Sequence, residues 1–325
     1  MAVTVYKSTD ASAPSLTNVA GTLVTVFDAI LVNGYGAKAA AGWGKEFSGT
    51  NKAAYRPPTG NRHYLRIDDA AGATALVRSF ETMSDVDMGT LPSPTGGNLT
   101  HGKCTAVLPV KWVAIADART LYFFARDGAV IDSYKALMFG DIFSYVAADT
   151  GKTFLQVDGS GTDPARYFAS WHELHVQLIP SQMAQVAAGA GRFLQRKYTL
   201  ATGALEVGWN ASPQYTSGTN INNNANFLAM NGKIAYPDPV TATLLVVPIY
   251  VHEKDSAPGS LPVIRGKMRG LWRILHPVSV IADGDTFVGV GELAGKTFMV
   301  IRDLGNTAPQ SMLMLETSDT WPSSA

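Results

Sequence analysis

The sequence predicts a mainly β protein, with sandwich-like or barrel-like sheets and one or two short α-helices. Three observations support this prediction. Short runs of alternating or β-branched residues recur along most of the 325 residues. The 31 glycines and 17 prolines imply many turns between these runs. Only one segment has strong helical periodicity, so helices are expected to be minor elements.

That segment is residues 15–33, for which the sequence predicts a helix. Ser15 is a suitable N-cap and Gly34 a suitable C-cap. An amphipathic helix of this kind is not stable alone, so it is expected to pack on a sheet or on a neighbouring chain. Its apolar stripe follows three- and four-residue spacings and comprises Leu16, Val19, Leu23, Val26, Phe27, Ile30 and Leu31.

The rest of the N-terminal half is predicted to form strands and turns. Residues 34–60, rich in Gly, Ala and Lys, indicate loops and short strands. Residues 91–102, with two prolines and two adjacent glycines, indicate a long loop or a hairpin tip. Asp117-Ala118-Arg119 is the expected turn of an antiparallel pair. The predicted strands are 63–67, 110–116, 120–126, 136–146 and 153–157.

Residues 159–164 (GSGTDP) are the clearest candidate boundary. They predict an N-terminal helix plus β domain at 1–160 and a C-terminal β domain at 165–325, although one intertwined domain stays open. Residues 180–194 have helical spacing interrupted by two glycines, and 212–226 has the composition of a long polar loop. The predicted C-terminal strands are 171–178, 244–251, 263–275, 286–290, 297–302 and 312–316.

The composition excludes several classes of function. Lys and Arg total 26 and Asp and Glu total 26, which argues against nucleic-acid contact through a broadly basic surface. No membrane-spanning segment is expected, because the apolar stretch 21–34 contains Asp28. Residues 1–12 are polar and lack a signal-peptide core. A single cysteine, Cys104, excludes an intrachain disulfide framework and a multi-cysteine zinc site.

Charged residues make up only 16% of the chain, below the roughly 25% of typical soluble domains. A weakly charged surface is poorly protected against self-association. One interpretation is that other subunits cover much of this surface. The alternative is that some monomeric β proteins, secreted ones especially, simply carry little charge.

One glycine-rich segment, Gly291 to Thr297, superficially looks like a phosphate-binding loop. That motif needs four residues between its first glycine and Gly-Lys-Thr, whereas here there are three. The following residues, 298–301, look like a strand, so no helix N-terminus would face a phosphate. A hairpin turn is the favoured interpretation.

Metal and nucleophile patterns are also incomplete. His172 and His175 are one residue short of the HExxH spacing, and a strand would send them to opposite faces. The acidic pairs Asp85/Asp87 and Asp283/Asp285 lack the further ligands of an EF-hand, so turn capping is favoured. No nucleophile elbow occurs, and Cys104 is interpreted as a semi-buried thiol rather than a reactive one.

Three cations alternate along a predicted strand: Arg265, Lys267 and Arg269. On a strand they point the same way and form a short basic stripe. Such a stripe could line a nucleic-acid channel, but no aromatic residues are interleaved for base stacking. Pairing with acids of an adjacent subunit, or exposure to water, is favoured.

Ten short segments taken together resemble a family of tailed-bacteriophage virion structural proteins. They are mostly glycine-rich turns and strand ends, they occur across nearly the whole chain, and they contain no catalytic signature. In order they are LVNGYGAKAAAGW at 31–43, FSGTNKA at 47–53, YLR at 64–66, MFGD at 138–141, YPDP at 236–239, PIYVHE at 248–253, RGLW at 269–272, DGDTF at 283–287, LAGKTF at 293–298 and LETS at 315–318.

The resemblance implies a non-enzymatic assembly subunit, tail-associated or tail-proximal, located in virions assembled in the host cytoplasm. Its expected partners are copies of itself in a symmetric assembly and other phage virion proteins. No catalytic, cofactor-binding or metal-binding residue is expected, and no cofactor. The alternatives are a carbohydrate-binding, receptor-binding or glycan-cleaving tail module that uses aromatics such as Trp209 or Tyr215, and a capsid-surface decoration protein.

Overall fold

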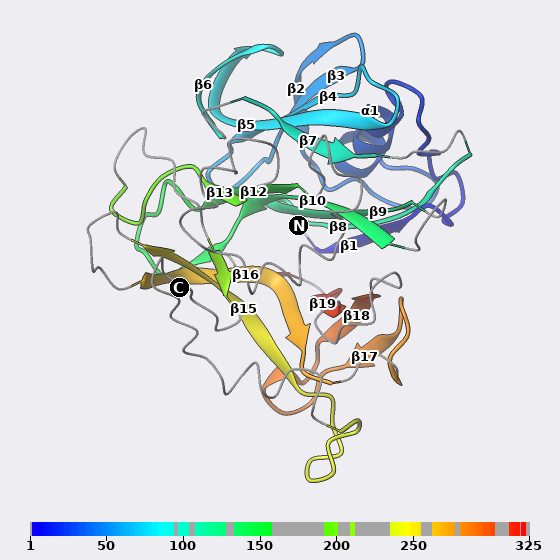
Figure 1. Cartoon of the computed structure of the whole chain (residues 1–325), viewed down its shortest axis with the longest axis vertical. Helices are drawn as coiled ribbons and strands as arrows, with labels where there is room; N and C mark the ends of the chain where they lie inside the picture. The colour runs from blue at the N-terminus through cyan, green and yellow to red at the C-terminus, as the bar shows by residue number, and fades with distance from the viewer. Residues whose placement is uncertain are drawn as a thin grey trace.

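Three antiparallel sheets lie one above another in the computed structural model, with a short helix between the first two (Figure 1). The predicted mainly β class is confirmed. We call the layers the N-terminal sheet, the central sheet and the C-terminal sheet. The structure describes residues 2–93, 97–103, 108–127, 133–157, 192–200, 209–211, 235–254, 262–276, 280–302, 312–318 and 320–322.

The central sheet has the order β1-β8-β9-β10-β12-β13. Its strands β8 and β9 are the predicted antiparallel pair, with Ala116 opposite Leu121 next to the turn. The Asp117 carboxylate holds that turn, because it accepts hydrogen bonds from the backbone N–H groups of Arg119 and Thr120, both at 2.8 Å. The strands are β1 Thr4–Lys7, β8 Lys111–Ala116, β9 Thr120–Asp127, β10 Ser133–Asp141, β12 Thr153–Val157 and β13 Arg192–Leu194.

The N-terminal sheet has the order β2-β3-β4-β5-β6, and β7 also pairs with β5. The long strand β5 therefore holds β6 along one part of its length and β7 along another. The strands are β2 Gly44–Gly49, β3 Lys52–Arg56, β4 Tyr64–Asp68, β5 Thr74–Asp85, β6 Met88–Ser93 and β7 Leu99–Gly102.

The C-terminal sheet has the order β14-β15-β16-β19-β18-β17, and the short β11 joins it beside β16. Five predicted strands are confirmed within a few residues, and 297–302 and 312–316 match in both bounds. The sixth, 171–178, lies outside the described residues. The strands are β11 Phe143–Ser144, β14 Trp209–Ala211, β15 Val246–Lys254, β16 Pro262–Ile274, β17 Thr286–Val288, β18 Thr297–Arg302 and β19 Met312–Glu316.

Both faces of the central sheet are buried. On β9, Phe123 faces the core shared with the helix and the N-terminal sheet, whereas Tyr122 and Phe124 face the core shared with the C-terminal sheet. Alternate residues of a strand point to opposite faces, so a sheet covered on both sides needs apolar residues without alternation. Each fully buried large apolar side chain contributes about 1.5–3 kcal/mol relative to exposure. The two apolar faces thus hold the three layers together.

The helix begins later than the sequence predicts. The α-helix α1 spans Thr22–Phe27 rather than starting after Ser15. Upstream, Leu16 forms a β-bridge with Val110, and Gly21 has a positive φ of 83°, so both residues leave the helical path. Val19, expected in the apolar stripe, is exposed. The predicted Ser15 cap is therefore wrong.

A carboxylate from another element caps the helix instead. The buried Asp69 accepts the Leu23 backbone N–H at 2.7 Å and forms an ion pair with Lys103 at 2.6 Å. The Lys103 ammonium also donates to the Val19 carbonyl at 2.7 Å. A carboxylate at a helix N-terminus accepts hydrogen bonds from N–H groups that have no partner within the helix. Its negative charge is also attracted to the partial positive charge at that end of the helix. The cap joins the helix to residues distant in sequence.

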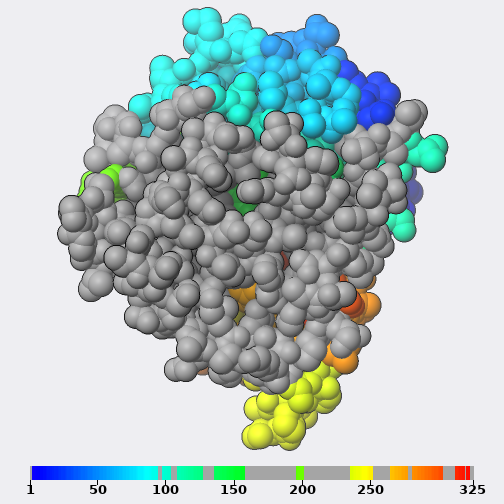
Figure 2. Space-filling model, viewed as in Figure 1, coloured from blue at the N-terminus to red at the C-terminus, as the bar shows by residue number. Residues whose placement is uncertain are grey.

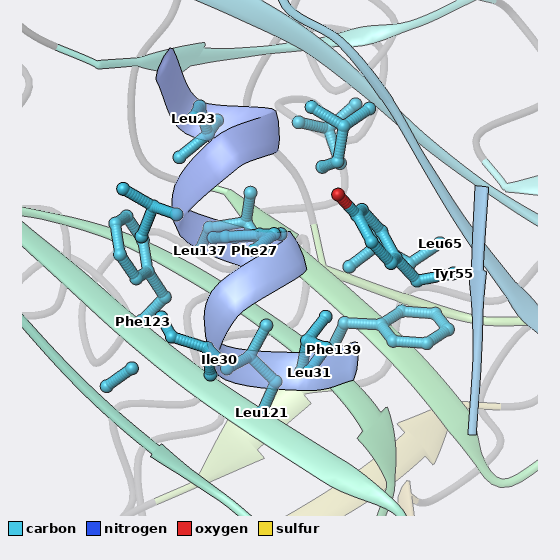
Figure 3. Close-up of a cluster of buried hydrophobic side chains, with 14 of the residues drawn as sticks. Leu23, Phe27, Ile30, Leu31, Tyr55, Leu65, Leu121, Phe123, Leu137 and Phe139 are labelled. Atoms are coloured by element: carbon cyan, nitrogen blue, oxygen red, sulfur yellow. The ribbon is translucent and has the colours of Figure 1, made fainter. Parts of the chain in front are cut away.

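The helical segment continues as a π-helix over Asp28–Asn33 and ends, as predicted, at Gly34. The Gly34 N–H donates to the Ala29 carbonyl, and the next two carbonyls, of Ile30 and Leu31, accept the N–H groups of Ala41 and Trp43. Residues 41–43 thus donate to carbonyls that would accept hydrogen bonds from the next turn if the helix continued. The buried face of both turns packs between the sheets (Figure 3) and includes Leu23, Phe27, Ile30 and Leu31.

The prediction of a long loop or a hairpin tip at 91–102 is wrong for residues 91–93 and 99–102. Residues 91–93 belong to β6 and residues 99–102 are β7. Leu99 is buried, and both segments pair with β5. Prolines and glycines suggested a loop because they are rare inside strands. The pairing offered by β5 overrides that local preference.

The two arginines of the basic stripe on β16 are buried, whereas Lys267 is half-buried, which corrects the prediction of an exposed or inter-subunit role for the arginines. Arg265 forms an ion pair with Asp149 at 2.6 Å, and Arg269 forms one with Asp117 at 2.6 Å. Both guanidinium groups have almost no exposure. The Lys267 ammonium lies 5.1 Å from the Phe143 ring centroid. The arginines therefore pair with acids of the same chain.

These contacts continue as a polar chain through the three layers. The Arg265 guanidinium donates to the backbone carbonyl of Arg196, and the Arg196 side chain binds Glu81 on β5 at 2.8 and 2.5 Å. A Cβ at Gly151 would lie 2.4 Å from the Arg196 Cβ and 2.8 Å from the Arg265 guanidinium. Glycine at 151 thus leaves space for the two arginines to meet.

The proposed division at 159–164 stays a prediction, because these residues lie outside the described part of the chain. Two pairings cross it. The strand β11 (Phe143–Ser144), before the division, pairs with β16, and β13 (Arg192–Leu194), after it, pairs with β12. Among the described residues, no helix is both long enough and apolar enough to cross a membrane.

Replacing Arg269 with methionine should lower the free energy of unfolding by about 3–5 kcal/mol, because it leaves the Asp117 carboxylate buried without its counter-ion. The matched control is Lys267→Met on the same strand, for which a loss below about 1 kcal/mol is expected, since only a cation–π contact is removed. Urea unfolding measures both. Equal losses in the two variants would contradict the assigned role of Arg269.

Acid should weaken the Asp149–Arg265 pair. Burial alone would raise the pKa of Asp149, but hydrogen bonds from Arg265, Ser144 and the Gly151 N–H outweigh burial and hold that pKa below its ordinary value of 3.8. A carboxyl whose pKa is depressed by folding stabilises the fold above its unfolded pKa and loses this effect as pH falls through the folded pKa.

The wild type should therefore lose stability as pH falls below about 3.8, and Asp149→Asn should lose less over that window while being less stable at pH 7. Denaturant midpoints measured from pH 7 to 2.5 test this. The exposed Glu46→Gln is the control and should parallel the wild type. A curve for Asp149→Asn that runs parallel to the wild type would refute the assignment.

Candidate interaction surface

An apolar groove lies on the outer face of the C-terminal sheet, the face turned away from the central sheet. Its volume is about 230 Å³. One wall is the segment 235–245, which we call the arm, and the other is the hairpin formed by β17 and β18. The lining residues are Tyr236, Ala242, Thr243, Leu244, Val246, Phe287, Val288, Gly289, Val290, Leu293, Phe298 and Met314.

The arm projects from one end of the molecule, seen in yellow at the bottom of Figures 1 and 2. Its turn is held by Asp238, which accepts hydrogen bonds from the Val240 and Thr241 backbone N–H groups at 3.1 and 2.8 Å. These bonds lower the pKa of Asp238 below its ordinary value. The turn presents Val240, whose side chain is 90% exposed.

A buried histidine anchors the base of the arm. The Nε2 atom of His276 accepts the Leu245 N–H at 2.7 Å, and Nδ1 lies 2.9 Å from the Ala235 carbonyl oxygen. This arrangement requires a neutral ring with its proton on Nδ1. The Tyr236 ring packs edge-on against the same imidazole at 5.4 Å. Both ends of the arm are therefore tied to His276, which lies two positions after the end of β16.

The opposite wall is an edge of the sheet. The strand β17 is the last strand in the sheet order, and its hairpin closes through a hydrogen bond from the Gly289 N–H to the Lys296 carbonyl at 2.8 Å. Two valines of this hairpin, Val288 and Val290, are 72% and 59% exposed. An edge strand flanked by exposed apolar side chains favours association with another polypeptide.

The segment that looked like a phosphate-binding loop is a turn, as predicted. Gly291–Leu293 forms one turn of 3₁₀-helix, and β18 follows directly as a strand paired with β17. The Lys296 ammonium binds the Glu316 carboxylate at 2.8 and 2.9 Å. This lysine is thus held in an ion pair beside the turn.

The acidic pairs lie in turns, as predicted. Asp87 binds Lys52 at 3.0 Å and also binds Arg66, while Asp85 accepts the Asp87 N–H. In the other pair, the Asp283 carboxylate accepts the Arg302 N–H at 2.9 Å and Asp285 accepts the Ala282 N–H at 2.7 Å. Within the described ranges, no group of three or more His, Cys, Asp or Glu residues is arranged to hold a metal ion.

Several sequence candidates lie outside the described residues: Cys104, His172, His175 and Tyr215, and also the segments 159–164 and 212–226. Trp209 is placed in β14 by its backbone alone. The described tryptophans contribute to cores: Trp43, Trp112 and Trp321 are buried, and Trp272 packs partly buried against Phe298. None of these four supplies an open aromatic platform.

Sequence reasoning did not single out the exposed valines. A signal was present, because valines 288 and 290 alternate with glycines 289 and 291, an apolar pattern without charges beside a turn. The same pattern fits a buried strand end equally well. Only the sheet order, which leaves β17 at the edge, distinguishes the two cases.

Comparison with known proteins adds no relative. No protein-family model matches the chain, and no curated protein sequence matches it.

Replacing Asp238 with alanine should loosen the arm without unfolding the sheets, because the turn loses its carboxylate acceptor. Backbone amides at 240 and 241 should then exchange with solvent at least several-fold faster, whereas amides of β18 should be unchanged. Hydrogen exchange read by mass spectrometry measures both. Unchanged exchange in the arm would show that Asp238 does not hold the turn.

Proposed function

We propose that this protein is a structural subunit of a tailed-bacteriophage particle, in the tail or close to it, and that it acts through contacts between subunits. One structural observation carries the proposal: an apolar groove and an apolar edge strand lie together on the outer face of the C-terminal sheet. The resemblance to virion structural proteins across nearly the whole sequence supplies the biological setting.

Charge supports an assembly role. Of the few charged residues, many are paired internally, including the buried pairs of Asp69, Asp117 and Asp149. Charges used inside a fold contribute nothing to surface repulsion between molecules. The remaining surface then resists self-association weakly, as the low overall charge predicts.

The same geometry suggests how subunits would meet. The exposed Val288 and Val290 offer apolar area that a partner can bury, and β17 offers a backbone edge for pairing. If this surface pairs with itself the result is a two-fold dimer, whereas a ring or an open stack requires it to meet a second, different surface on the next copy. A stable contact of this kind buries more than about 1,000 Å² in total.

A glycan-binding or glycan-cleaving tail module needs exposed aromatic rings with acids facing across a groove. The groove described here is lined by aliphatic and aromatic side chains and contains no carboxylate among its lining residues. The four tryptophans with described side chains pack into cores. The structural-subunit proposal therefore fits the described surface better.

Replacing Val288 with aspartate should weaken self-association at least tenfold, because a charge on the edge strand must be desolvated in any contact. The matched control is Val19→Asp, an exposed valine on a different part of the molecule, which should associate like the wild type. Sedimentation velocity across a hundredfold concentration range measures all three proteins.

A wild type that stays monomeric at high concentration and binds no other virion protein would overturn the proposed function. Equal weakening by both substitutions would show that the C-terminal edge is not the contact. Electron microscopy of particles with this protein labelled would then decide whether it occupies the tail, the neck or the head surface.

A further inference from the structure

The apolar core between the N-terminal and central sheets ends at a group of polar side chains. Ser79 on β5 lies opposite Leu65 on β4 and opposite Ser93 on β6. Directly opposed residues of antiparallel strands point to the same face, and Leu65 belongs to the core beneath that face. The two serines therefore point inward, between the layers.

The segment that follows β13 completes this group. The side-chain amide of Gln195 donates to the Ser79 hydroxyl at 2.6 Å. The next residue, Arg196, binds Glu81, which lies two positions after Ser79 on the same strand. His63 immediately precedes β4, and extension of the register from Tyr64 opposite Phe80 places it opposite Glu81. We call His63, Ser79, Ser93 and Gln195 the interlayer polar cluster.

Among the residues that the structure describes, three atoms of this cluster have no hydrogen-bond partner. They are the Ser93 hydroxyl, the Gln195 Oε1 and the His63 Nδ1. The residues are 0%, 3% and 6% exposed, so bulk solvent does not reach them freely. Buried polar atoms are nearly always hydrogen-bonded, and each one left unpaired is costly. The Ser93 and Gln195 atoms both lie beside Ser79, Ser93 as its partner in the strand register and Gln195 through its hydrogen bond, so one bound molecule can serve both.

The chemistry of the three atoms selects the kind of molecule. The Gln195 oxygen only accepts, so the guest must donate, whereas the Ser93 hydroxyl can donate or accept. Glu81 and Arg196 already neutralise each other, so no charge is left for an ion to balance. Burial lowers the pKa of His63 to about 4, so its ring is neutral at pH 7 and adds no charge. A metal ion would find only one imidazole here.

We infer that the interlayer polar cluster binds internal water, at least one molecule bridging Ser93 and Gln195 between the N-terminal sheet and the central sheet. Buried waters of this kind typically make about three hydrogen bonds to otherwise unpaired groups. The two layers are then joined by a dry apolar core at the helix and by a hydrated contact at this end. The inference does not depend on the proposed function, because it concerns the isolated chain.

Thermal unfolding of Ser93→Ala tests the inference through the sign of the change. If water links the hydroxyl to its neighbours, its removal breaks favourable hydrogen bonds and should lower the Tm by a few degrees. If the hydroxyl is dry and unpaired, its removal relieves a desolvation penalty and should raise the Tm. The matched control is Ser144→Ala, whose hydroxyl donates to Asp149 at 2.6 Å and whose loss must lower the Tm.

A crystal structure at better than about 1.5 Å resolution gives the direct readout. The expected result is a water peak within 2.6–3.2 Å of both the Ser93 hydroxyl and the Gln195 oxygen, and loss or displacement of that peak in Ser93→Ala. A raised or unchanged Tm for Ser93→Ala, or a wild-type crystal without this water, would overturn the inference. A metal ion or an organic molecule at the site would overturn it equally.

Discussion

Two buried arginines of β16 are the constraint on which the stacking of the C-terminal sheet depends. Arg265 and Arg269 extend from that sheet to Asp149 and Asp117, carboxylates in loops that follow strands β11 and β8. The Tyr122 hydroxyl of the central sheet donates to the Arg269 carbonyl at 2.7 Å. Desolvated charges tolerate little displacement, since an unpaired buried charge is strongly unfavourable. The apolar core between the central and C-terminal sheets stabilises their contact. The two ion pairs determine how the C-terminal sheet is positioned on the central sheet.

The central sheet explains why the candidate surface lies on the C-terminal sheet. Its two faces are covered by the other layers, so it offers no broad face to a partner. Among the described residues, the arm and the β17–β18 hairpin lie on the outer face of the C-terminal sheet and leave an apolar groove between them. The proposed assembly role needs a rigid interior and an outer surface that can bind another chain. The cores between the layers supply the first and the apolar groove supplies the second.

The candidate surface was predictable only in part. The sequence correctly indicated strands near Phe287 and Phe298 and a turn at Gly291, because local patterns determine them. It could not indicate that Val288 is exposed while Val300, on the paired strand, is fully buried. The basic stripe shows the same limit. Alternation along the strand indicates that Arg265 and Arg269 point the same way, but it does not indicate that they point into the protein.

By itself, the sequence determined the β class, the positions of most described strands, the β8–β9 turn at Asp117 and the helix end at Gly34. These features depend on residues close together along the chain, whose side-chain alternation and φ preferences act locally. Only the tertiary structure decided where the helix starts, because Asp69, 46 positions from Leu23, provides its cap. It also decided which charges are buried and which edge is exposed, because both depend on contacts between segments that the chain brings together only when folded.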